Sequence, residues 1–441
     1  MIADLKPYAE YKASGLPWIG DGPQHWQERR LDTLFTLRRE SPQPGDQRIT
    51  GYLDGRVTLR SNVAGQKIKG VVKEAGWQRV YPGDFAISGM NAHLGGMGVS
   101  DSLGKCSPIY LVLIPKPDTN AHYVSHAVRH TAHMGALKAL VSTIRFNSAD
   151  FKREDLKSIR LMLPPPDEQA AIVRFLDYAN RRLERAIRAK RKVIALLNEQ
   201  KQAIIHRAVT RGLDPNAPLK PSGLHWLGEI PAHWEVRQLG RFITLQRGFD
   251  ITKDQQAAGS IPVVSSGGVS SYHNKSTSQG PGVIVGRKGS VGTVHFIEEP
   301  YWAHDTTLWV KDFGGNHPKF VYYVLSLLDL KRFDTGSANP TLNRNIVHPE
   351  IVAFPPPDEQ VLISAYLDNA LTKMKQAIIR TEREIALLRE YRTRLIADVV
   401  TGKLDVRGVA ATLPDETDEP AMADGAEAED EAPCDDEEAS E

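Results

Sequence analysis

The side chains of this chain that could do chemistry do not form a familiar catalytic motif. Asn339-Pro340-Thr341-Leu342 comes closest to the Asn/Asp-Pro-Pro-Tyr/Phe motif that holds the flipped base in adenine methyltransferases, but it lacks the second proline and the aromatic residue. Gly98 to Cys106 superficially resembles a phosphate-binding P-loop. It has one residue too many and no serine or threonine after Lys105. No nuclease or ATPase pattern stands out, so we expect no catalytic residue and no enzyme activity in the chain alone.

A group of histidines is the next candidate for chemistry. His122, His126, His130 and His133 fall on one expected helix, and the first three are spaced i, i+4. No glutamate follows them at the spacing of a zinc protease, and a metal site would need further ligands that the sequence does not place. We therefore expect a buried or surface histidine cluster and no metal site.

The charge distribution points to a polyanionic partner. The net charge is only +1, but fourteen acidic residues lie between Asp415 and Glu441, and no lysine or arginine follows position 410. Without that tail the chain has 55 basic and 40 acidic residues, a surplus of about 15. Lysine and arginine bind nucleic acid by displacing counterions from phosphates. The alternative is a surplus spread over solvated helix faces.

Arginine, lysine, asparagine and glutamine can pair with base edges, because they offer two donors or a donor and an acceptor. The candidates for DNA binding in the first half of the chain are Arg56, Arg60, Lys67, Lys69, Asn91, His93, Arg145 and Asn147. Those in the second half are Arg247, Lys275, Arg287, Lys288, Asn339, Asn343 and Arg344. The turn at residues 287–290, between two expected strands, could bring cations and backbone N–H groups onto a phosphate. A tight, solvated hairpin is an equally good interpretation.

The elements that must position these residues occur twice. Ser14-Gly15-Leu16-Pro17-Trp18-Ile19-Gly20 returns 208 residues later as Ser222-Gly223-Leu224-His225-Trp226-Leu227-Gly228, and Pro23, His25 and Trp26 recur as Pro231, His233 and Trp234. Pro-Pro-Pro-Asp-Glu-Gln at 164–169 reappears at 355–360, and the match continues with about 22 of 51 positions identical. The segments between the repeats, 27–163 and 235–354, share little sequence. The chain therefore alternates two variable modules with two copies of a fixed helix.

Each fixed segment is expected to be one long helix. The prolines at 164–166 exclude a helix continuing from upstream, and Asp167 and Glu168 place negative charge at the positive end of the next helix. In the first copy apolar residues follow 4-3 spacing at Ile172, Leu176, Ala179, Leu183, Ala186, Val193, Leu197 and Ile204. The second copy follows Ile363, Leu367, Ala370, Met374 and Ala377, then shifts register to Ile378, Ile385, Leu388, Leu395 and Val399. This pattern predicts a coiled coil with a stutter, in which the two helices pack antiparallel.

Mixed α/β structure is expected in each module. Gly282 to Gly286 and Val291 to Phe296 are rich in β-branched residues and predict strands. Helices are expected near His122 to Leu140 and from Pro318 to Phe333.

Together these features resemble the specificity subunits of type I restriction-modification enzymes over about residues 10–407. The most specific elements are the duplicated Pro-Pro-Pro-Asp-Glu-Gln before a long helix and the Trp-Ile-Gly and Trp-Leu-Gly sequences before each module. Stretches at 83–87, 95–100 and 107–110 are similar to one common class of target-recognition domain, and those at 286–292 and 336–340 resemble another. The acidic tail after about residue 410 departs from the family pattern.

The resemblance implies that each module reads one half of a split double-stranded DNA target, while the helices fix the gap between the halves. It also implies two modification subunits docked on the helices, each methylating adenine with S-adenosylmethionine, and restriction/translocase subunits that use ATP and Mg. No cofactor is expected in this chain itself. The alternative is a stand-alone two-headed DNA-binding regulator or scaffold.

The expected fold class is α+β: two mixed α/β target-recognition domains separated by two long antiparallel coiled-coil helices, related by a pseudo-twofold axis. Five segments follow: a first recognition domain with its lead-in at 1–163, a spacer helix at 164–212, a second recognition domain at 213–354, a second spacer helix at 355–406 and a disordered acidic tail at 407–441. The two cysteines and the lack of an apolar leader or span predict a soluble, cytoplasmic protein that does not bind a membrane.

Overall fold

The structure is a computed structural model that describes residues 5–63, 75–140, 144–145, 148–149, 151–224, 226–333 and 341–414. It contains two compact units. The first unit combines Met1–Arg188 with Ile385–Glu441, and the second is Ala189–Glu384. Each unit therefore holds one variable module and part of both long helices.

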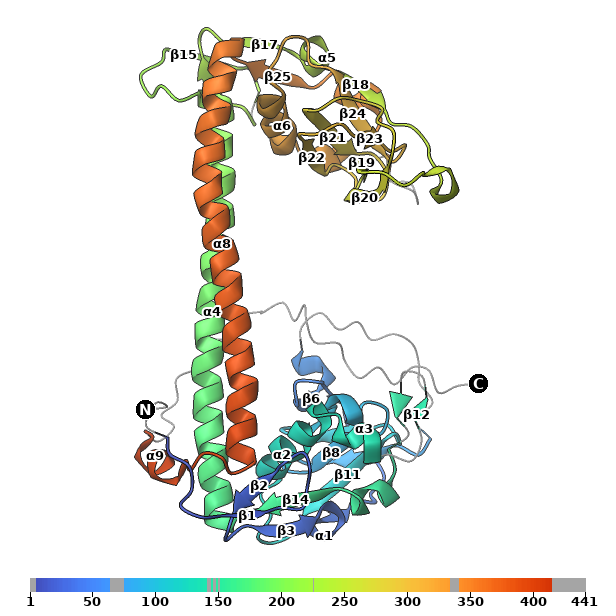
Figure 1. Cartoon of the computed structure of the whole chain (residues 1–441), viewed down its shortest axis with the longest axis vertical. Coiled ribbons are helices and arrows are strands. Elements are labelled where there is room, and N and C mark those ends of the chain that lie inside the picture. Colours follow the sequence, from blue (N-terminus) through green and yellow to red (C-terminus); the bar gives the residue numbers. More distant parts are fainter. Residues whose placement is uncertain are drawn as a thin grey trace. The chain divides into compact units, whose positions relative to one another are not determined.

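The first unit is built on a four-stranded antiparallel sheet in the order β4-β11-β8-β9. These strands are β4 (Phe35–Leu37), β11 (Tyr110–Pro115), β8 (Phe85–Ser88) and β9 (Met97–Val99). Helix α2 (Ala121–His133) lies against the sheet and buries Val124 and Val128 in the same core as Phe85 and Ile87 (Figure 1). The burial of apolar residues four apart on α2 is what holds this layer together.

The second unit repeats this order as β18-β24-β21-β22, also antiparallel. Its strands are β18 (Thr244–Arg247), β24 (Thr307–Asp312), β21 (Gly282–Gly286) and β22 (Val294–Ile297), with helix α6 (Pro318–Leu327) packed on the sheet (Figure 1). A smaller sheet adds β20 (Gly268–His273), β19 (Ile261–Ser265) and β23 (Trp302–Ala303). The mixed α/β structure expected of both modules is confirmed, and the main sheets of the two modules share one strand order despite their different sequences.

The shorter elements connect these sheets to the helices. Two-stranded pairs join β3 (Gln27–Arg30) to β14 (Arg160–Leu163), β17 (Glu235–Gln238) to β25 (Ile351–Phe354), β1 (Tyr11–Ala13) to β2 (Asp21–Pro23), and β15 (Leu219–Pro221) to β16 (Glu229–Pro231). Further pairs are β5 (Ile49–Gly51) with β6 (Val57–Leu59), β7 (Gln78–Val80) with β10 (Gly104–Cys106), and β12 (Ile144–Arg145) with β13 (Ser148–Ala149). Short helices are α1 (Leu31–Leu34), α3 (Ala136–Leu140), α5 (Leu239–Phe242), α7 (Arg344–Val347) and α9 (Arg407–Thr412).

Two long helices, α4 (Pro166–Arg211) and α8 (Pro357–Val400), carry the fixed segments. In the first unit Ile172 and Leu176 of α4 share a core with Leu395 and Val399 of α8. In the second unit Lys190 Nζ lies 2.6 Å from Glu384 Oε2, and Ile205, Ala208 and Val209 share a core with Ile363 and Leu367. Residue numbers rise along one helix as they fall along the other, so the predicted antiparallel pairing is confirmed.

Beyond Leu183 the apolar seam of α4 was predicted correctly only in part, since Leu197 and Ile204 are half-buried in agreement with the prediction. Ala186 and Val193 were assigned to it, but Ile187 is buried instead and Val193 is 46% exposed. An extra step of four residues, from Leu183 to Ile187, shifts the register, so α4 contains a stutter as well. On α8 Ile363, Leu367, Ile385, Leu395 and Val399 are buried as predicted.

The two module helices are shorter than predicted. The one expected from His122 to Leu140 is interrupted at Gly135, whose φ of +76° an L-amino acid rarely adopts, and divides into α2 and α3. The one expected from Pro318 to Phe333 ends at Leu327, because Leu328 takes an extended conformation before the 3₁₀ turn Leu330–Phe333. Strand β22 begins at Val294 rather than Val291.

Candidate nucleic-acid interface

The topology of the second unit brings several polar segments to one end of its main sheet. Strand β24 is antiparallel to both β18 and β21, with Arg247 opposite Leu308 and Gly286 opposite Thr307. The last residue of β18, the turn after β21 and the loop before β24 must therefore meet. We call this region the sheet end, and it consists of Arg247, residues 287–290, residues 304–306 and residues 341–344.

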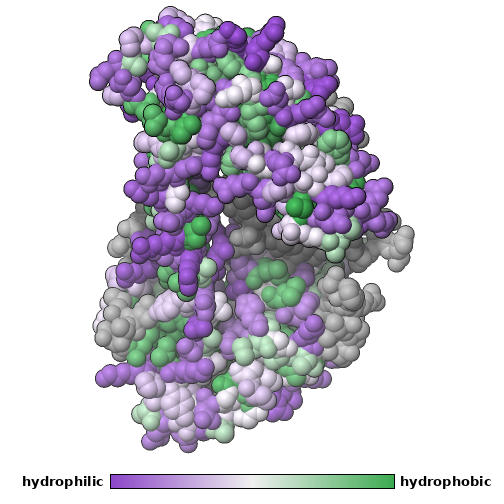
Figure 2. Space-filling model, turned by 45° about the horizontal axis from the view of Figure 1, so that its top comes forward, coloured by the Kyte–Doolittle hydropathy of each residue, from purple (hydrophilic) through white to green (hydrophobic). Residues whose placement is uncertain are grey.

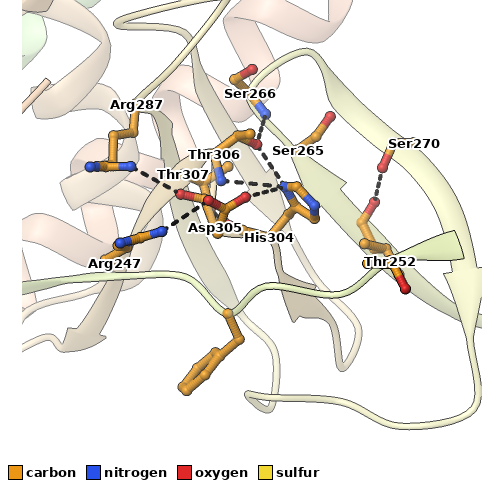
Figure 3. Close-up of polar contacts among 12 residues, drawn as sticks. Arg247, Thr252, Ser265, Ser266, Ser270, Arg287, His304, Asp305, Thr306 and Thr307 are labelled. Carbon is orange, nitrogen blue, oxygen red and sulfur yellow. Dashed lines mark hydrogen bonds and ion pairs between the residues drawn. The ribbon is translucent and has the colours of Figure 1, made fainter. Parts of the chain in front are cut away.

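Hydrogen bonds fix the sheet end internally. Arg247 Nη2 lies 3.0 Å from Asp305 Oδ2, and Arg287 Nη1 donates to the Asp305 carbonyl at 3.4 Å (Figure 3). The backbone N–H groups of Arg287 and Lys288 both donate to the Thr306 carbonyl, at 2.8 and 3.0 Å. The turn after β21 and the loop before β24 are thus joined by side-chain and backbone contacts.

Arg287 lies in an unusual electrostatic position for a surface arginine. It is half-buried, and its pKa is lowered, first by burial and then by the nearby Arg247, while Asp305 acts in the opposite direction. A partly desolvated guanidinium interacts more strongly with an anion or a base edge than a fully hydrated one does. The sheet end therefore combines two neighbouring arginines with one carboxylate.

Asn343 and Arg344 reach the same place from another part of the chain. Leu342 N donates to the Arg287 carbonyl at 2.9 Å, and Lys288 pairs with Thr341 as an isolated bridge. The Asn343 side chain caps α7 by accepting from Asn345 N at 3.0 Å, and Arg344 Nη1 lies 3.5 Å from the Leu245 carbonyl. The structure thus gathers five of the predicted residues of this module: Arg247, Arg287, Lys288, Asn343 and Arg344.

The other predicted residues of this module lie elsewhere. Lys275 is exposed just beyond β20, in the smaller sheet. Asn339 falls outside the described residues.

The candidates of the first module are spread over several segments. Arg56 is ion-paired with Asp54 and lies over the Tyr52 ring, and Arg60 begins a 3₁₀ turn after β6. Asn91 and His93 lie around the turn before β9, where burial and then Lys138 lower the pKa of His93. Lys67, Lys69 and Asn147 fall outside the described residues. Arg145 belongs to β12, but its side chain is not described.

One candidate was missed in the first module although the sequence contained the signal. The 208-residue repeat continues past the lead-in, because Thr36, Leu37 and Arg39 recur as Thr244, Leu245 and Arg247. Arg39 is exposed and lies two residues beyond the end of β4, whereas Arg247 is the last residue of the equivalent strand β18. Arg39 is therefore the first-module counterpart of an arginine at the sheet end.

The duplicated Glu-Gln pairs attach each module to its helix. Glu168 accepts hydrogen bonds from Tyr8 Oη at 2.5 Å and Trp26 Nε1 at 2.9 Å, and His25 Nε2 lies 2.7 Å away. Glu359 has the equivalent histidine and tryptophan neighbours in the second unit, with His233 Nε2 at 2.7 Å and Trp234 Nε1 at 3.1 Å. We call these contacts the helix clamps. Their carboxylates bind side chains of the lead-in, a role that the prediction of charge at the helix terminus did not include.

The glutamines complete the clamps from the other side. Gln169 accepts from Asn120 N at 2.8 Å and donates to the carbonyls of Asp118 and Pro164. Gln360 accepts from His317 N at 2.8 Å and donates to the Pro355 carbonyl at 2.9 Å. Each buried amide thus ties the loop before a module helix to the start of a long helix.

The residues that the structure describes include one group able to surround a metal ion, namely Asp250, His304 and Asp305. Asp305 Oδ2 is already engaged by Arg247 at 3.0 Å, and His304 Nδ1 lies 3.2 Å from Asp305 Oδ1. A cation there would have to compete with the positive charge of Arg247 for the Asp305 carboxylate. The sheet end is therefore better suited to hold arginines than a metal.

The face of the molecule that Figure 2 shows is mostly polar. On the face shown in Figure 2 hydrophilic residues predominate, with scattered hydrophobic side chains between them. The exposed large hydrophobic residues include Val361, Leu362 and Tyr366 near the start of α8. No helix among the described residues combines the length and the apolar composition that crossing a membrane requires.

The chain consists of two α/β modules with the same main-sheet strand order, and a helix clamp joins each module to one long helix. The family model for the type I restriction modification DNA specificity domain matches residues 23–191 and 231–385, which together make up most of the sequence. The chain belongs to this family.

Individual relatives agree with this assignment. The chain is 27% identical over 243 residues to the MjaX type I restriction enzyme specificity subunit of Methanocaldococcus jannaschii, covering 50% of this chain and 53% of that protein. It is 32% identical over 93 residues to the MjaVIII specificity subunit of the same organism, covering 21% of this chain and 20% of the relative. These alignments span about half or less of the relatives' length.

A solved structure supports the fold. It concerns complex assembly and conformational transition of a type I restriction-modification system, and it matches with a TM-score of 0.67 over 87% of this chain and 99% of the other. At 15% sequence identity this likeness concerns the fold alone.

Proposed function

We propose that this chain is the DNA sequence-specificity subunit of a type I restriction-modification system. Each module reads one half of a split DNA target, and the long helices set the gap between the halves. The observation that carries the proposal is the sheet end, where Arg247, Arg287, Lys288, Asn343 and Arg344 converge on one edge of a DNA-specificity domain. Side chains of these types offer the donors and acceptors that base edges and phosphates require.

The chemistry belongs to partner subunits in this proposal. Two modification subunits dock on the long helices and methylate adenine with S-adenosylmethionine, and restriction subunits supply ATP- and Mg-dependent translocation and cleavage. The chain itself is non-catalytic and works in the cytoplasm. Support comes from the family assignment.

Reconstitution tests the proposal directly. The purified chain, a candidate modification subunit from the same genome and S-adenosylmethionine are incubated with genomic DNA, and methylated positions are mapped by sequencing. We expect adenine methylation at one split motif with both proteins present and none with either protein alone. Methylation by the modification subunit alone at the same motif, or no split motif at all, would contradict the proposal and favour a stand-alone DNA-binding regulator.

A binding measurement tests the sheet end. Arg287→Ala/Lys288→Ala is expected to weaken DNA binding and to flatten the plot of log affinity against log salt by about 2 for two lost phosphate contacts. Lys311→Ala is the control, because Lys311 is exposed on the neighbouring strand β24, toward the end opposite the sheet end. Either of two results would contradict phosphate binding at the sheet end. One is an unchanged slope of log affinity against log salt in the double variant, and the other is a change of the same amount per lost charge in Lys311→Ala.

A further inference from the structure

Asp305 holds two arginines of the sheet end at once. Its carboxylate receives Arg247, with Nη2 to Oδ2 at 3.0 Å, while its backbone carbonyl receives Arg287 Nη1 at 3.4 Å (Figure 3). The Asp305 side chain is largely buried, whereas that of Arg247 is 56% exposed. The acid is therefore covered, and the arginine that it holds faces outward.

The loop that carries Asp305 is fixed on both sides. The Thr307 hydroxyl donates to the His304 carbonyl at 2.6 Å, and Thr307 N donates to the same carbonyl at 3.0 Å. The next residue after Asp305, Thr306, accepts the backbone N–H groups of Arg287 and Lys288. Asp305 thus has a defined position relative to both arginines.

A carboxylate at this position works against simple attraction to phosphates, because it removes positive charge from the surface that would displace counterions. It does restrict the long Arg247 side chain, which otherwise rotates freely, while the backbone carbonyl of the same residue restricts Arg287. An arginine has five N–H donors in a planar fork, and a single contact to Asp305 leaves others to pair with the O6 and N7 atoms of guanine. The arrangement therefore favours selectivity over affinity.

We propose that Asp305 is a positioning residue that presents Arg247 and Arg287 to a guanine base edge in the half of the DNA target read by the second module. This inference rests on the proposed function. A divalent cation bound by Asp250, His304 and Asp305 is the competing assignment for the same residues.

The test is the methylated motif of the whole enzyme carrying Asp305→Asn. Cells lacking their own copy of this chain receive the wild-type or variant chain with the modification subunit, and their methylomes are sequenced. The variant is expected to tolerate other bases at one guanine position of one half-site, with a roughly 10- to 100-fold loss of discrimination there. The other half-site stays strict and serves as an internal control.

Two further measurements exclude a general loss of structure. With a loss of one negative charge, Asp305→Asn is expected to bind non-specific DNA more tightly, which a damaged module would not do. Wild-type methylation in vitro is expected to keep its motif in EDTA. If EDTA abolishes the requirement for guanine at this position, the site binds a cation and the proposal is overturned.

Arg247→Gln decides the matter if Asp305→Asn does not fold, because Arg247 is more than half exposed. It is expected to relax the same guanine position. Glu350→Gln is the matched control, since it breaks an ion pair with Arg332 in the same unit and is expected to leave the motif unchanged. An unchanged motif in Arg247→Gln, or relaxation of both half-sites in Asp305→Asn, would overturn the proposal. A wild-type chain with no split motif would instead refute the proposed function.

Discussion

At the scale of single residues, the helix clamps explain why Glu and Gln recur after the duplicated prolines. Glu168 is buried, and its carboxylate is shared by hydrogen-bond donors from Tyr8 and Trp26, while its neighbour Asp167 is exposed. Burying a carboxylate is unfavourable unless such donors compensate it. The two adjacent acids at the start of α4 therefore have different roles.

Glu168→Gln tests this difference. The variant loses charge-assisted hydrogen bonds in a buried site, so the free energy of unfolding is expected to fall by about 1–3 kcal/mol. Asp167→Asn makes the same chemical change in solvent and is expected to stay within about 0.5 kcal/mol of wild type. Urea unfolding followed by tryptophan fluorescence measures both, and equal effects would show that the clamp does not stabilise the first unit.

The histidines of α2 make the stability of the first unit depend on pH. Burial, with smaller effects of Arg129 and His122, lowers the pKa of His126 to about 4, and burial also lowers the pKa values of His130 and His133. Between about pH 6.5 and pH 4 His126 is therefore protonated in the unfolded chain but remains neutral in the folded unit, and His130 and His133 differ in the same direction. Stability is lost as the pH falls through this window.

His126→Gln is expected to reduce this loss. Urea midpoints of the wild type and the variant, compared at pH 7.5 and pH 5.5, should converge at the lower pH, because the variant has no imidazole at this position to protonate on unfolding. The exposed His122→Gln serves as control. An identical pH dependence in wild type and His126→Gln would mean that His126 titrates normally in the folded unit.

At the scale of elements, the paired helices depend on a narrow apolar seam. Leu367 of α8 is fully buried in the core of the second unit, while Leu362, five residues earlier, is 64% exposed. Leu367→Ala is expected to lower the free energy of unfolding by about 2–5 kcal/mol, since it leaves a cavity. Leu362→Ala deletes the same atoms from a side chain that is exposed to solvent. It should therefore change the free energy of unfolding by about 0.5 kcal/mol or less. Thermal or urea unfolding measures both variants. Similar losses of the free energy of unfolding would contradict the assignment of Leu367, but not Leu362, to the apolar seam.

The sequence predicted the helices better than the sheets because the helix signal is local and repeated. Two copies of one pattern with apolar residues every three or four positions were enough to predict α4 and α8 and their pairing. The extra step of four residues between Leu183 and Ile187 was not predicted. Apolar residues are adjacent there, so the sequence fits the helix register with or without the extra step. The common strand order of the modules depends on pairing between distant segments with dissimilar sequences, which no local pattern encodes.

The candidate site was predicted in its residue types and only partly in its arrangement. Composition selected Arg247, Arg287 and Lys288, but not Asp305, because an acid does not stand out in a search for basic residues. The structure adds Asp305 through the register of β24 against β18 and β21. Arg39 could have been found from the sequence by extending the 208-residue repeat a few positions further.

At the scale of the whole molecule, the acidic tail is a separate question from the folded units. The chain is described up to residue 414, and Leu413 is buried, with its carbonyl accepting from Arg174 Nη2 at 2.7 Å. A deletion that removes the tail without disturbing the first unit should therefore begin at Asp415 rather than at residue 411.

Deleting residues 415–441 is expected to leave DNA affinity at 0.15 M salt nearly unchanged. At that ionic strength charges are screened beyond about 8 Å, so a tail that only solvates the protein contributes little. Fluorescence anisotropy with a short duplex measures the effect, with tail-deleted Arg287→Ala/Lys288→Ala as control. A large gain in affinity that the control lacks would show instead that the tail covers the sheet end as a DNA mimic.

The first unit is assembled from both extremes of the chain. Asp405 N donates to the Lys6 carbonyl at 2.8 Å, and the Tyr11 hydroxyl donates to the Gly402 carbonyl at 3.1 Å. The second unit is one uninterrupted stretch, Ala189–Glu384. During translation the second unit can therefore mature as soon as its own residues leave the ribosome. The first module is synthesised first, but it cannot complete its core until the C-terminal part of α8, which packs against α4 in the first unit, has been synthesised.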